Sequence, residues 1–484
     1  MAETYELKRV ALVAVVLLSN LLFSGLVFGW APLLLMLQEE NQYAELCEDP
    51  EDSCVEQENK LNLLFAAASM AANVGALPIG MFLDSFGPKI TIAIAAVIEI
   101  MGLVLMALAD SQTFDVFLPG YLLLAFGGSV TMVSACPSSF LILEYQTAIL
   151  AAISCLFDGS SSVFLVLYSI RSTYGIERRE LFFGLVGVAA FVYTLLIGLW
   201  HVNEDALKHA VAPVEAKPLL SEVVHLDSAE YETIEIRLDS STSLAPVTLI
   251  DQPLRKQIMT FEYGYILTFA LVQVLRANLY IGTANKLLDN YGDGEHEYLF
   301  TKIFSFVLPL GFLFIPVIDY VVEKKGLSVS LIATNLLGVI FNTLELIPNL
   351  PLQCITFFVF AGYRAFLYAI TSAFAAKTFG LKNIGTLSGL MFTASALVSL
   401  LEYPAVYISN AYFDGDLSLV NSISLGLCIM LFPLTECYRS HQQVRRKKLQ
   451  RLGEDEDEDN ESPVTHGLTY LRSPVNYTKS PFKA

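Results

Sequence analysis

The stretch "GMFLDSFGPK" at residues 80–89 is partly repeated far along the chain by "PVIDYVVEKKG" at residues 316–326. In each stretch an aspartate, Asp84 or Asp319, closes an apolar run and is followed within a few residues by glycine and lysine. A short polar loop of this kind lets two apolar segments lie close together. Its aspartate can cap a helix or form an ion pair with a basic side chain. One copy is compatible with a purely structural loop. Two copies at equivalent places indicate a chain built from two repeated halves.

The apolar segments around both copies are long enough to cross a lipid bilayer. Of the 484 residues, 54% are hydrophobic and only 16% are charged, and the mean hydropathy is +0.55. A soluble domain carries about 25% charged residues. Blocks of about 18–28 apolar residues match a hydrocarbon core of roughly 30 Å, and their continuity excludes the alternation of a β-barrel. We therefore predict an all-α membrane protein with twelve transmembrane helices, at about 9–36, 61–82, 90–109, 116–142, 147–170, 181–200, 258–283, 299–322, 328–347, 352–376, 385–409 and 418–437.

A polar stretch without a sustained helical period separates the first six segments from the last six. We predict an N-terminal half at 1–201, a cytoplasmic linker at 202–257, a C-terminal half at 258–437 and a disordered cytoplasmic tail at 438–484. The tail contains "GEDEDEDNESP", which is typical of a solvated disordered segment; a phosphorylated or kinase-docking regulatory tail is the alternative.

Lysine and arginine gather on the side of the membrane that holds both termini, which predicts that both termini are cytoplasmic. The loop 171–180 departs from this rule, because it is predicted to lie on the outer side and yet contains Arg171, Arg178 and Arg179. Much of the net charge of −19 lies in the tail and in outer loops, so it does not indicate a nucleic-acid partner.

We expect a multi-pass protein of the plasma membrane, with a lysosomal or vacuolar membrane as the alternative. The linker contains "EAKPLL" at 215–220 and "YETI" at 231–234, which fit dileucine and tyrosine-based sorting signals. If both signals are functional, sorting adaptors bind the linker.

Two of the seven cysteines, Cys47 and Cys54, lie together in the first outer loop. The outer side is oxidising in a protein of the secretory pathway, which favours a disulfide between them. Two free thiols are the alternative.

The stretch "SCLFDGSSSVFLV" at 154–166 places Asp158 in the middle of an apolar segment. A charge there costs roughly 2.5–3.5 kcal/mol or more, so the carboxylate must face protein or water and not lipid. Ser154, Ser161 and Ser162 share its helical face and are expected to keep it solvated. Asp158 either locks two helices together or lines a substrate passage.

Arg364 is the counterpart of Asp158 in the second half, with Tyr368, Thr371 and Ser372 on its helical face. A guanidinium always carries its charge and presents a fork that suits a carboxylate. Two opposite charges in opposite halves can pair directly or hold the two ends of a zwitterion. A purely structural salt bridge is the rival interpretation.

Further polar and aromatic residues complete the candidate site. Gln273 and Arg276 share one face of their segment and are added to the substrate-binding set, while Glu99 is expected to be a scaffold carboxylate. Phe28 and Trp30 either form a gate or mark the membrane interface. The predicted substrate-binding residues are Asp158, Ser161, Ser162, Arg364, Tyr368, Arg276 and Gln273, and the predicted gating residues are Asp84, Asp319, Phe28 and Trp30.

The sequence carries no metal-ligand spacing, no phosphate-binding loop and no nucleophile elbow, so we expect neither an enzyme nor a cofactor. None of the six histidines lies inside a predicted segment. Proton coupling would therefore have to use Asp158, Glu99 or Glu402. Passive uniport is the simpler hypothesis.

The stretch at 80–89 resembles the loop 2–3 signature of the major facilitator superfamily, with Ser85 where that pattern usually has a basic residue. This departure argues against a charge relay at position 85. The resemblance then narrows to solute carrier family 43. Its motifs are "SGLVFGW" (24–30), "LFDGSSSVF" (156–164), "YIGTAN" (280–285), "RAFLYA" (364–369) and "GLMFTASALVSLLEYP" (389–404).

The resemblance implies a twelve-helix major facilitator fold and sodium-independent, facilitative transport of large neutral amino acids; one branch of the family is associated with purine nucleobases. We therefore expect a uniporter of a small organic solute, most simply a neutral amino acid, working by alternating access. The alternatives are a nucleobase carrier, a proton-coupled carrier and a non-transporting receptor or scaffold. The mid-membrane charges argue against a scaffold, which has no need of desolvated ions.

Overall fold

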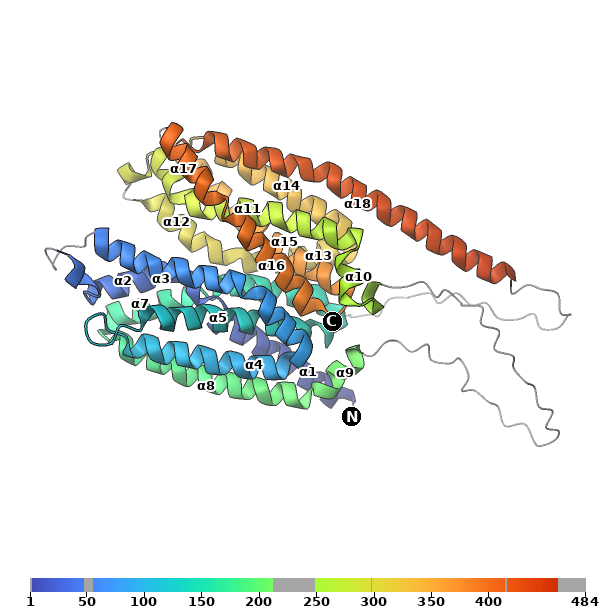
Figure 1. Cartoon of the computed structure of the whole chain (residues 1–484), viewed down its shortest axis with the longest axis horizontal. Helices are drawn as coiled ribbons and strands as arrows, with labels where there is room; N and C mark the ends of the chain where they lie inside the picture. The colour runs from blue at the N-terminus through green and yellow to red at the C-terminus, as the bar shows by residue number, and fades with distance from the viewer. Residues whose placement is uncertain (1, 48–54, 212–248, 297, 414–415, 460–484) are drawn as a thin grey trace, which may run out of the picture. The chain divides into compact units, whose positions relative to one another are not determined.

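The computed structural model describes residues 2–47, 55–211, 249–296, 298–413 and 416–459. It is built from α-helices, as predicted, and divides into a large unit, Met1–Tyr438, and a second unit, Arg439–Ala484. Figure 1 shows the long helices of the large unit running side by side.

The N-terminal helices follow the first six predicted segments, and three of those segments are interrupted. They are α1 (Ala2–Ser19) with η1 (Asn20–Ser24), η2 (Leu26–Phe28) and α2 (Trp30–Glu39); α3 (Val55–Val74); α4 (Ala76–Leu108); α5 (Phe117–Ala135) with η4 (Cys136–Phe140); α6 (Gln146–Gly159) with α7 (Ser162–Tyr174); and α8 (Arg178–Val202).

The C-terminal helices follow the last six predicted segments. They are α11 (Phe261–Asn290); α12 (Leu299–Val307) with η8 (Leu308–Phe314) and α13 (Ile315–Lys325); α14 (Leu327–Glu345); α15 (Leu350–Phe379); α16 (Ile384–Ser399) with α17 (Glu402–Tyr412); and α18 (Ser418–Asp459). The shorter elements are η3 (Ala44–Leu46), η5 (Leu143–Tyr145), α9 (Glu204–Val211), η6 (Leu249–Asp251), α10 (Leu254–Ile258) and η7 (Asp293–His296).

Eleven helical segments of the described residues are long and apolar enough to cross a membrane, one fewer than predicted. The difference lies in α4, which continues through Gly87 although this residue has a φ of +76°. Glycine adopts this conformation without steric cost, and Pro88 follows it. Two helices therefore meet at Gly87. The second predicted segment corresponds to α3 together with the part of α4 before Gly87, and the third corresponds to the part of α4 after it.

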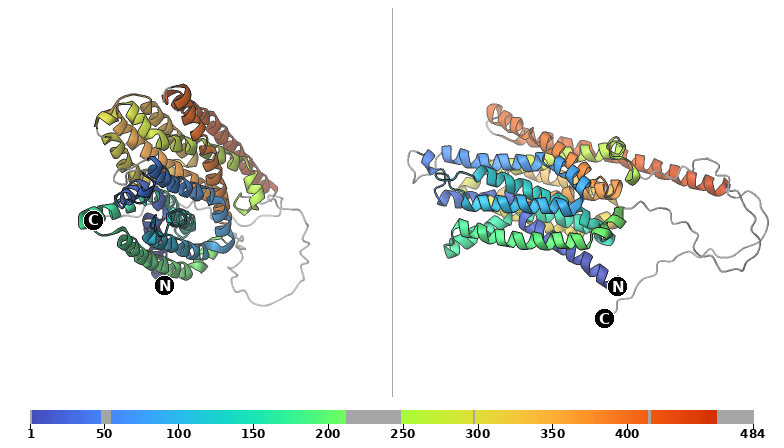
Figure 2. Two further views of the ribbon diagram at one scale, coloured as in Figure 1. Left: turned by 60° about the vertical axis from the view of Figure 1, so that its left-hand side comes forward. Right: turned by 60° about the horizontal axis from the view of Figure 1, so that its bottom comes forward.

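Among the described residues, two large hydrophobic cores form within the large unit, and a third, small cluster draws on both the N-terminal and the C-terminal helices and consists of Leu150, Ala373, Ala376 and Ile384. The first core is built from residues between Leu12 and Trp200, and the second mainly from residues between Tyr263 and Tyr438. Two residues of α6, Ala151 and Cys155, belong to the second core, so α6 packs against both groups of helices. Figure 2 shows the blue-to-green and the yellow-to-red helices as neighbouring groups. The exact boundaries at 201, 257 and 437 stay a prediction.

The predicted linker and tail are partly helical. The linker contains α9 and α10 at its two ends, while both candidate sorting signals lie outside the described residues. The helix α18 continues to Asp459, so the tail is not disordered from residue 438 onward as predicted. The stretch "QQVRRKKLQRL" at 442–452 consists mostly of good helix formers, which explains the continuation.

The basic loop at 171–180, which joins α7 to α8, contacts the C-terminal ends of α2 and α4. Arg178 Nε lies 2.7 Å from Glu40 Oε2, and Arg171 also forms an ion pair with Glu40. The guanidinium of Arg178 also donates to the carbonyl oxygens of Met106 and Ala109, at the C-terminal end of α4. A cation is favourable at that end of a helix, so these arginines have a structural reason to depart from the charge rule.

Candidate functional site

The fifth predicted segment is not one continuous helix, because it breaks directly after Asp158. Helix α6 ends at Gly159 and α7 begins at Ser162. Helix breaks near the middle of a membrane segment free backbone groups and commonly line the substrate sites of transporters. The break explains why Asp158 is followed by glycine and three serines.

The serine hydroxyls near Asp158 bind backbone carbonyl groups, contrary to our expectation that they solvate its carboxylate. Ser161 Oγ donates to the carbonyl oxygen of Asp158 at 2.7 Å, and Ser162 Oγ donates to that of Gly159 at 2.7 Å. Ser154 likewise donates to a carbonyl within its own helix. Serine hydroxyls commonly bond to carbonyls three or four residues earlier.

The first segment is broken at the place where it meets this break. The short elements η1 and η2 replace regular α-helix there. A Cβ atom on Gly25 would overlap the carbonyl oxygen of Phe157, and one on Gly29 would crowd that of Ser161. Glycine permits this approach of two backbones because it has no side chain. The motifs at 24–30 and 156–164 are therefore the two sides of one contact.

The charge at Asp158 is paired with Arg364 of α15. Arg364 Nη2 donates to Asp158 Oδ1 at 2.7 Å, and the two side chains are only 10% and 13% exposed. The guanidinium carbon also lies 5.6 Å from the ring centre of Tyr368, within the range of a cation–π contact. Asp158 and Arg364 come from the N-terminal and C-terminal groups of helices, so the pair joins them.

The ion pair does not use all the hydrogen-bonding capacity of the guanidinium. A guanidinium has five N–H donors, and within the part of the chain that the structure describes Arg364 Nε is buried without a partner. Burying two charges costs several kcal/mol per ion, which their mutual attraction repays only in good geometry. The site can therefore accept a further carboxylate-like oxygen, or exchange Asp158 for one.

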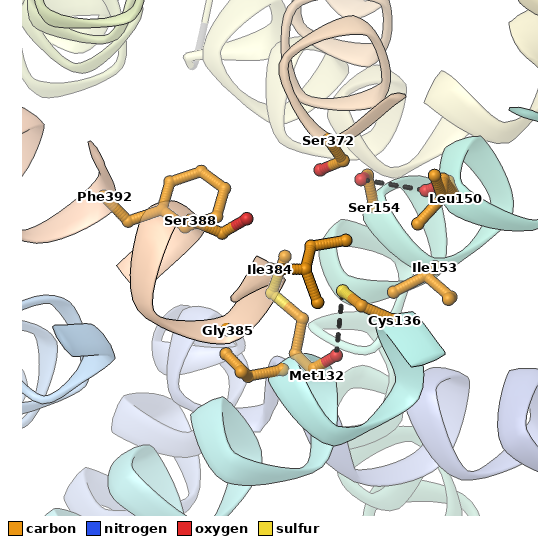
Figure 3. Close-up of a pocket in the computed structure, with 11 residues that line it drawn as sticks. Met132, Cys136, Leu150, Ile153, Ser154, Ser372, Ile384, Gly385, Ser388 and Phe392 are labelled. Atoms are coloured by element: carbon orange, nitrogen blue, oxygen red, sulfur yellow. Dashed lines mark hydrogen bonds between the residues drawn. The ribbon is translucent and has the colours of Figure 1, made fainter. Parts of the chain in front are cut away.

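A small pocket lies between the two groups of helices (Figure 3), and Ser154, one helical turn before Asp158, is one of the residues that line it. Its volume is about 20 Å³, room for roughly one water molecule. Ser154 of α6 and Ser372 of α15 line it, and so does Phe392 of α16, whose ring centre lies 6.3 Å from that of Tyr368. Sequence analysis missed Phe392, although it lies inside a quoted motif, because an apolar residue in an apolar segment carries no signal.

Gln273 and Arg276 are not brought to the ion pair, which corrects their predicted place in the substrate site. The guanidinium of Arg276 donates to Gln273 Oε1, to the carbonyl oxygen of Gly338 and to Asn342 Oδ1. Tyr363 donates its hydroxyl to Gln273 Oε1 at 2.7 Å. All these groups lie on α11, α14 and α15. They form a buried scaffold network inside the C-terminal group of helices.

A row of polar residues in the apolar segment of α14 indicates this network in the sequence. Asn335, Asn342 and Glu345 are buried polar residues at a spacing that places them along one face of an otherwise apolar segment. Asn335 Oδ1 accepts a hydrogen bond from Gln273 at 2.8 Å. A helix with such a stripe requires polar partners on its neighbour, because unpaired polar groups are costly to bury.

Trp30 is not positioned as a gate between the two groups of helices. It is 8% exposed, and its ring lies 5.9 Å from that of Phe65 and 5.3 Å from that of Tyr121, both in the N-terminal group. Phe28 contacts Phe157, with ring centres 5.5 Å apart, so it lies beside the break at Asp158.

Asp84 caps a helix of the opposite group, and Asp319 lies near the first turn of another. The carboxylate of Asp84 accepts the backbone N–H groups of Gly385 at 2.9 Å and Thr386 at 2.6 Å, in the first turn of α16. Asp319 lies near the backbone N–H of Ala148 in the first turn of α6, but its Oδ1 has no hydrogen-bond partner among the described residues. A carboxylate is favourable at a helix N-terminus. Both repeated aspartates thus lie at the boundary between the two groups of helices, and Asp84 forms hydrogen bonds across it.

Asp84 and Asp319 lie at the end of the large unit where the linker begins and ends, which we name the linker end. Lys89 Nζ lies 3.3 Å from Glu204 Oε2 of α9, and Gln257 of α10 donates to the carbonyl oxygen of Phe379. Glu323 adds a further link there, because its Oε1 accepts hydrogen bonds from Thr147 and Lys377, each at 2.5 Å. The two groups of helices are therefore in close contact at the linker end.

The remaining candidates take no part in the ion pair. Neither carboxyl oxygen of the fully buried Glu99 has a hydrogen-bond partner among the described residues, and its side chain packs against Gly127 of α5. Glu402 packs against Gly282 of α11. Cys47 is disulfide-bonded, and Cys54 lies outside the described residues.

Comparisons with known proteins agree with this architecture. The family model "Sugar (and other) transporter" matches residues 15–142. The chain is 25% identical to equilibrative nucleobase transporter 1 of Bos taurus, covering 88% of this chain and 94% of that one. It is 24% identical to large neutral amino acids transporter small subunit 3 of Homo sapiens, covering 86% and 90%.

A solved structure shares the fold at low sequence identity. The proton:xylose symporter XylE, a major facilitator superfamily transporter, superimposes with a TM-score of 0.56 at 14% identity, covering 87% of this chain and 95% of that one. This chain therefore has the major facilitator fold.

Proposed function

We propose that this chain, a multi-pass membrane transporter of the major facilitator superfamily and not an enzyme, carries large neutral amino acids. The observation that carries the proposal is the buried ion pair between Asp158 and Arg364, one ion from each group of helices. A neutral amino acid is a zwitterion, and its carboxylate and ammonium group are complementary to these two ions.

In the proposed mechanism, the charged groups of the substrate replace Asp158 and Arg364 as each other's binding partners. When substrate enters, its carboxylate binds the planar fork of Arg364, and its ammonium group binds Asp158 directly or through water. Each ion keeps a partner whether the site is empty or occupied, so neither charge is left alone in a site of low polarity. No coupling ion is required, which supports facilitated diffusion.

Alternating access requires the contacts at the linker end to open and close. The cap at Asp84 stabilises the arrangement in which the two groups of helices meet at that end. Opening exposes the N-terminus of α16 and breaks the link from Thr147 to Glu323. The gate at this end therefore consists of a small set of polar contacts that can be exchanged for water.

A nucleobase carrier is the second candidate, favoured by the aromatic pair of Tyr368 and Phe392 beside the ion pair. The bovine relative named above is a nucleobase transporter. A nucleobase is a flat, uncharged ring at neutral pH that could stack on these side chains, but it gives no reason for two buried ions.

Uptake into proteoliposomes distinguishes the two. We expect saturable uptake of radiolabelled leucine, unchanged by a sodium or pH gradient, and no comparable uptake of adenine. Arg364→Lys keeps the charge but loses the bidentate fork. We expect it to raise the half-saturation concentration about tenfold, since a hydrogen bond to a charged group contributes about 1.5 kcal/mol. Unchanged leucine kinetics in well-folded Arg364→Lys and Asp158→Asn protein would refute the proposal.

We also propose that both termini and the linker are cytoplasmic and that the protein works in the plasma membrane. The concentration of lysine and arginine on that side supports this orientation. An epitope inserted within residues 212–248 should label only after cells are permeabilised; labelling on intact cells would contradict the orientation. If the dileucine signal is functional, Leu219→Ala with Leu220→Ala should raise the surface density, and an unchanged distribution would argue against it.

A further inference from the structure

We propose that the pocket between the two groups of helices receives the apolar side chain of the transported amino acid and thereby sets its selectivity. This inference rests on the proposed function, because it assumes that Asp158 and Arg364 hold the substrate's charged groups. It adds the part of the substrate that those ions do not recognise.

The pocket lies next to the ion pair because the same helices carry both. Ser154 is four residues before Asp158 on α6, and Ser372 is four residues after Tyr368 on α15. Residues four apart lie on one face of a helix, about one turn of 5.4 Å from each other. A side chain of four to seven heavy atoms bridges that distance.

Tyr368 joins the two parts of the site. Its ring lies 5.6 Å from the guanidinium carbon of Arg364 and 6.3 Å from the ring of Phe392, which lines the pocket. The α-carbon of a substrate held by the ions would therefore lie beside Tyr368, with its side chain directed toward Phe392.

The chemistry of the pocket fits an apolar group and excludes a charged one. Its walls include Met132, Ile153 and Ile384, and none of the residues that line it is charged. The hydroxyl of Ser154 already donates to the carbonyl oxygen of Leu150 at 3.0 Å, as Figure 3 shows. A charged side chain would be desolvated there without a partner, which is costly.

The present size of the pocket belongs to the state in which the linker end is closed. About 20 Å³ holds one water molecule and no amino-acid side chain. The walls come from both groups of helices: Met132 and Ile153 from one, Ile384 and Phe392 from the other. Any movement that separates the groups therefore widens the pocket, and the residues on its walls set which side chains fill it.

The test compares leucine with alanine in proteoliposomes, using the full chain. Ile153→Ala removes part of the wall, and Ile149→Ala is the matched control, because it makes the same change on the same helix at a buried residue that does not line the pocket. We expect Ile153→Ala to lower the ratio of leucine to alanine uptake about tenfold, because one or two methylene groups in an apolar pocket usually have an effect of this size. Ile149→Ala should leave the ratio of leucine to alanine uptake unchanged.

Ser372→Asp is the second variant and keeps the test decisive if Ile153→Ala does not fold. A carboxylate in the pocket should admit lysine, which the unaltered protein should reject. Equal effects of Ile153→Ala on leucine and alanine, together with no lysine uptake by folded Ser372→Asp protein, would overturn the subsite and leave the amino-acid function intact. Absence of amino-acid uptake by the unaltered protein would overturn the proposed function itself.

Discussion

Asp158 and Arg364 are two ions that would each be prohibitively costly inside a membrane, and their pairing makes both tolerable. The two side chains keep some exposure, and Arg364 Nε, which has no hydrogen-bond partner among the described residues, leaves donor capacity for a third charged group. A pair that served structure alone would gain from complete satisfaction of every donor. The incomplete pairing supports a site that binds and releases a charged molecule.

A charge swap separates structure from transport at these two residues. Asp158→Ala leaves an unpaired buried guanidinium, so we expect a loss of about 3–5 kcal/mol of stability. Asp158→Arg combined with Arg364→Asp should recover most of this loss but not uptake, because the substrate's charges would meet like charges. Thermal unfolding in detergent measures the first effect and leucine uptake the second. Full uptake by the swapped protein would identify a purely structural salt bridge.

Among the elements, the broken first and fifth segments depend on each other. The backbones of η1–η2 and of the α6–α7 break come so close that glycine is needed at Gly25 and Gly29. Helix α12 shows another local requirement, since its first turn is capped by the buried Asp293 from the preceding loop. The first contact lies directly beside Asp158 and so positions the site, whereas the second lies within the C-terminal group of helices.

Gly25→Ala tests the contact between the two breaks. The added methyl group would overlap the carbonyl oxygen of Phe157, so we expect loss of most folded protein. Gly184→Ala in α8 is the matched control, because nothing lies within 4 Å of the added atom. That change should be neutral or stabilise the helix by up to about 1 kcal/mol. Size-exclusion profiles in detergent report both outcomes; equal behaviour of the two variants would disprove the close contact.

Because of the carboxyl group of Asp293, we expect the stability of the folded protein to depend on pH. Burial opposes its ionisation, but hydrogen bonds from the backbone N–H groups of Phe300 and Thr301 and from the Thr301 hydroxyl outweigh it and hold the pKa of Asp293 below its ordinary value. The resulting stability is present above the unfolded-state pKa of about 4 and is lost as the pH falls through the lower folded-state pKa.

Asp293→Asn should therefore lower the melting temperature at pH 7, by an amount corresponding to about 1 kcal/mol for a helix cap. The difference from the unaltered protein should shrink as the pH falls below about 4. Melting curves between pH 7 and pH 3 measure it. A difference that stays constant over this range would show that ionised Asp293 does not stabilise the fold.

At the scale of the whole membrane unit, two repeated aspartates lie where the two groups of helices meet. Asp84 caps α16, and Asp319 lies near the first turn of α6, so the two copies of the sequence feature occupy corresponding places in the two groups. Both aspartates lie at the linker end, while the ion pair lies deeper between the groups. Closure at the linker end and binding of the substrate's charged groups therefore use different residues, while Gly385 belongs both to the Asp84 cap and to the wall of the pocket.

Asp84→Ala should shift the transporter toward the state that is open at the linker end. Losing a cap of about 1 kcal/mol changes a two-state ratio about fivefold. Cys136, which lines the pocket between the groups, is a native reporter: its alkylation, followed by mass spectrometry, should become several-fold faster. Asp110→Ala is the control, because that partly exposed aspartate accepts hydrogen bonds from Gln112 and Thr113 of its own loop and, within the described part of the chain, forms no hydrogen bond with α16. Equal rates in both variants would argue against a gating role for Asp84.

The sequence alone determined the membrane class, the twelve-segment repeat and the inward orientation of Asp158 and Arg364. These are local properties, because the length of an apolar run and the cost of a charge in lipid depend on neighbouring residues only. The tertiary structure decided which polar residues meet. Arg276 and Arg364 look alike in the sequence, yet one satisfies Gln273 and Asn342 within its own group of helices and the other reaches Asp158 across the boundary. That choice depends on the rotation and register of packed helices, which side-chain volumes across the whole unit set together, so no single segment encodes it.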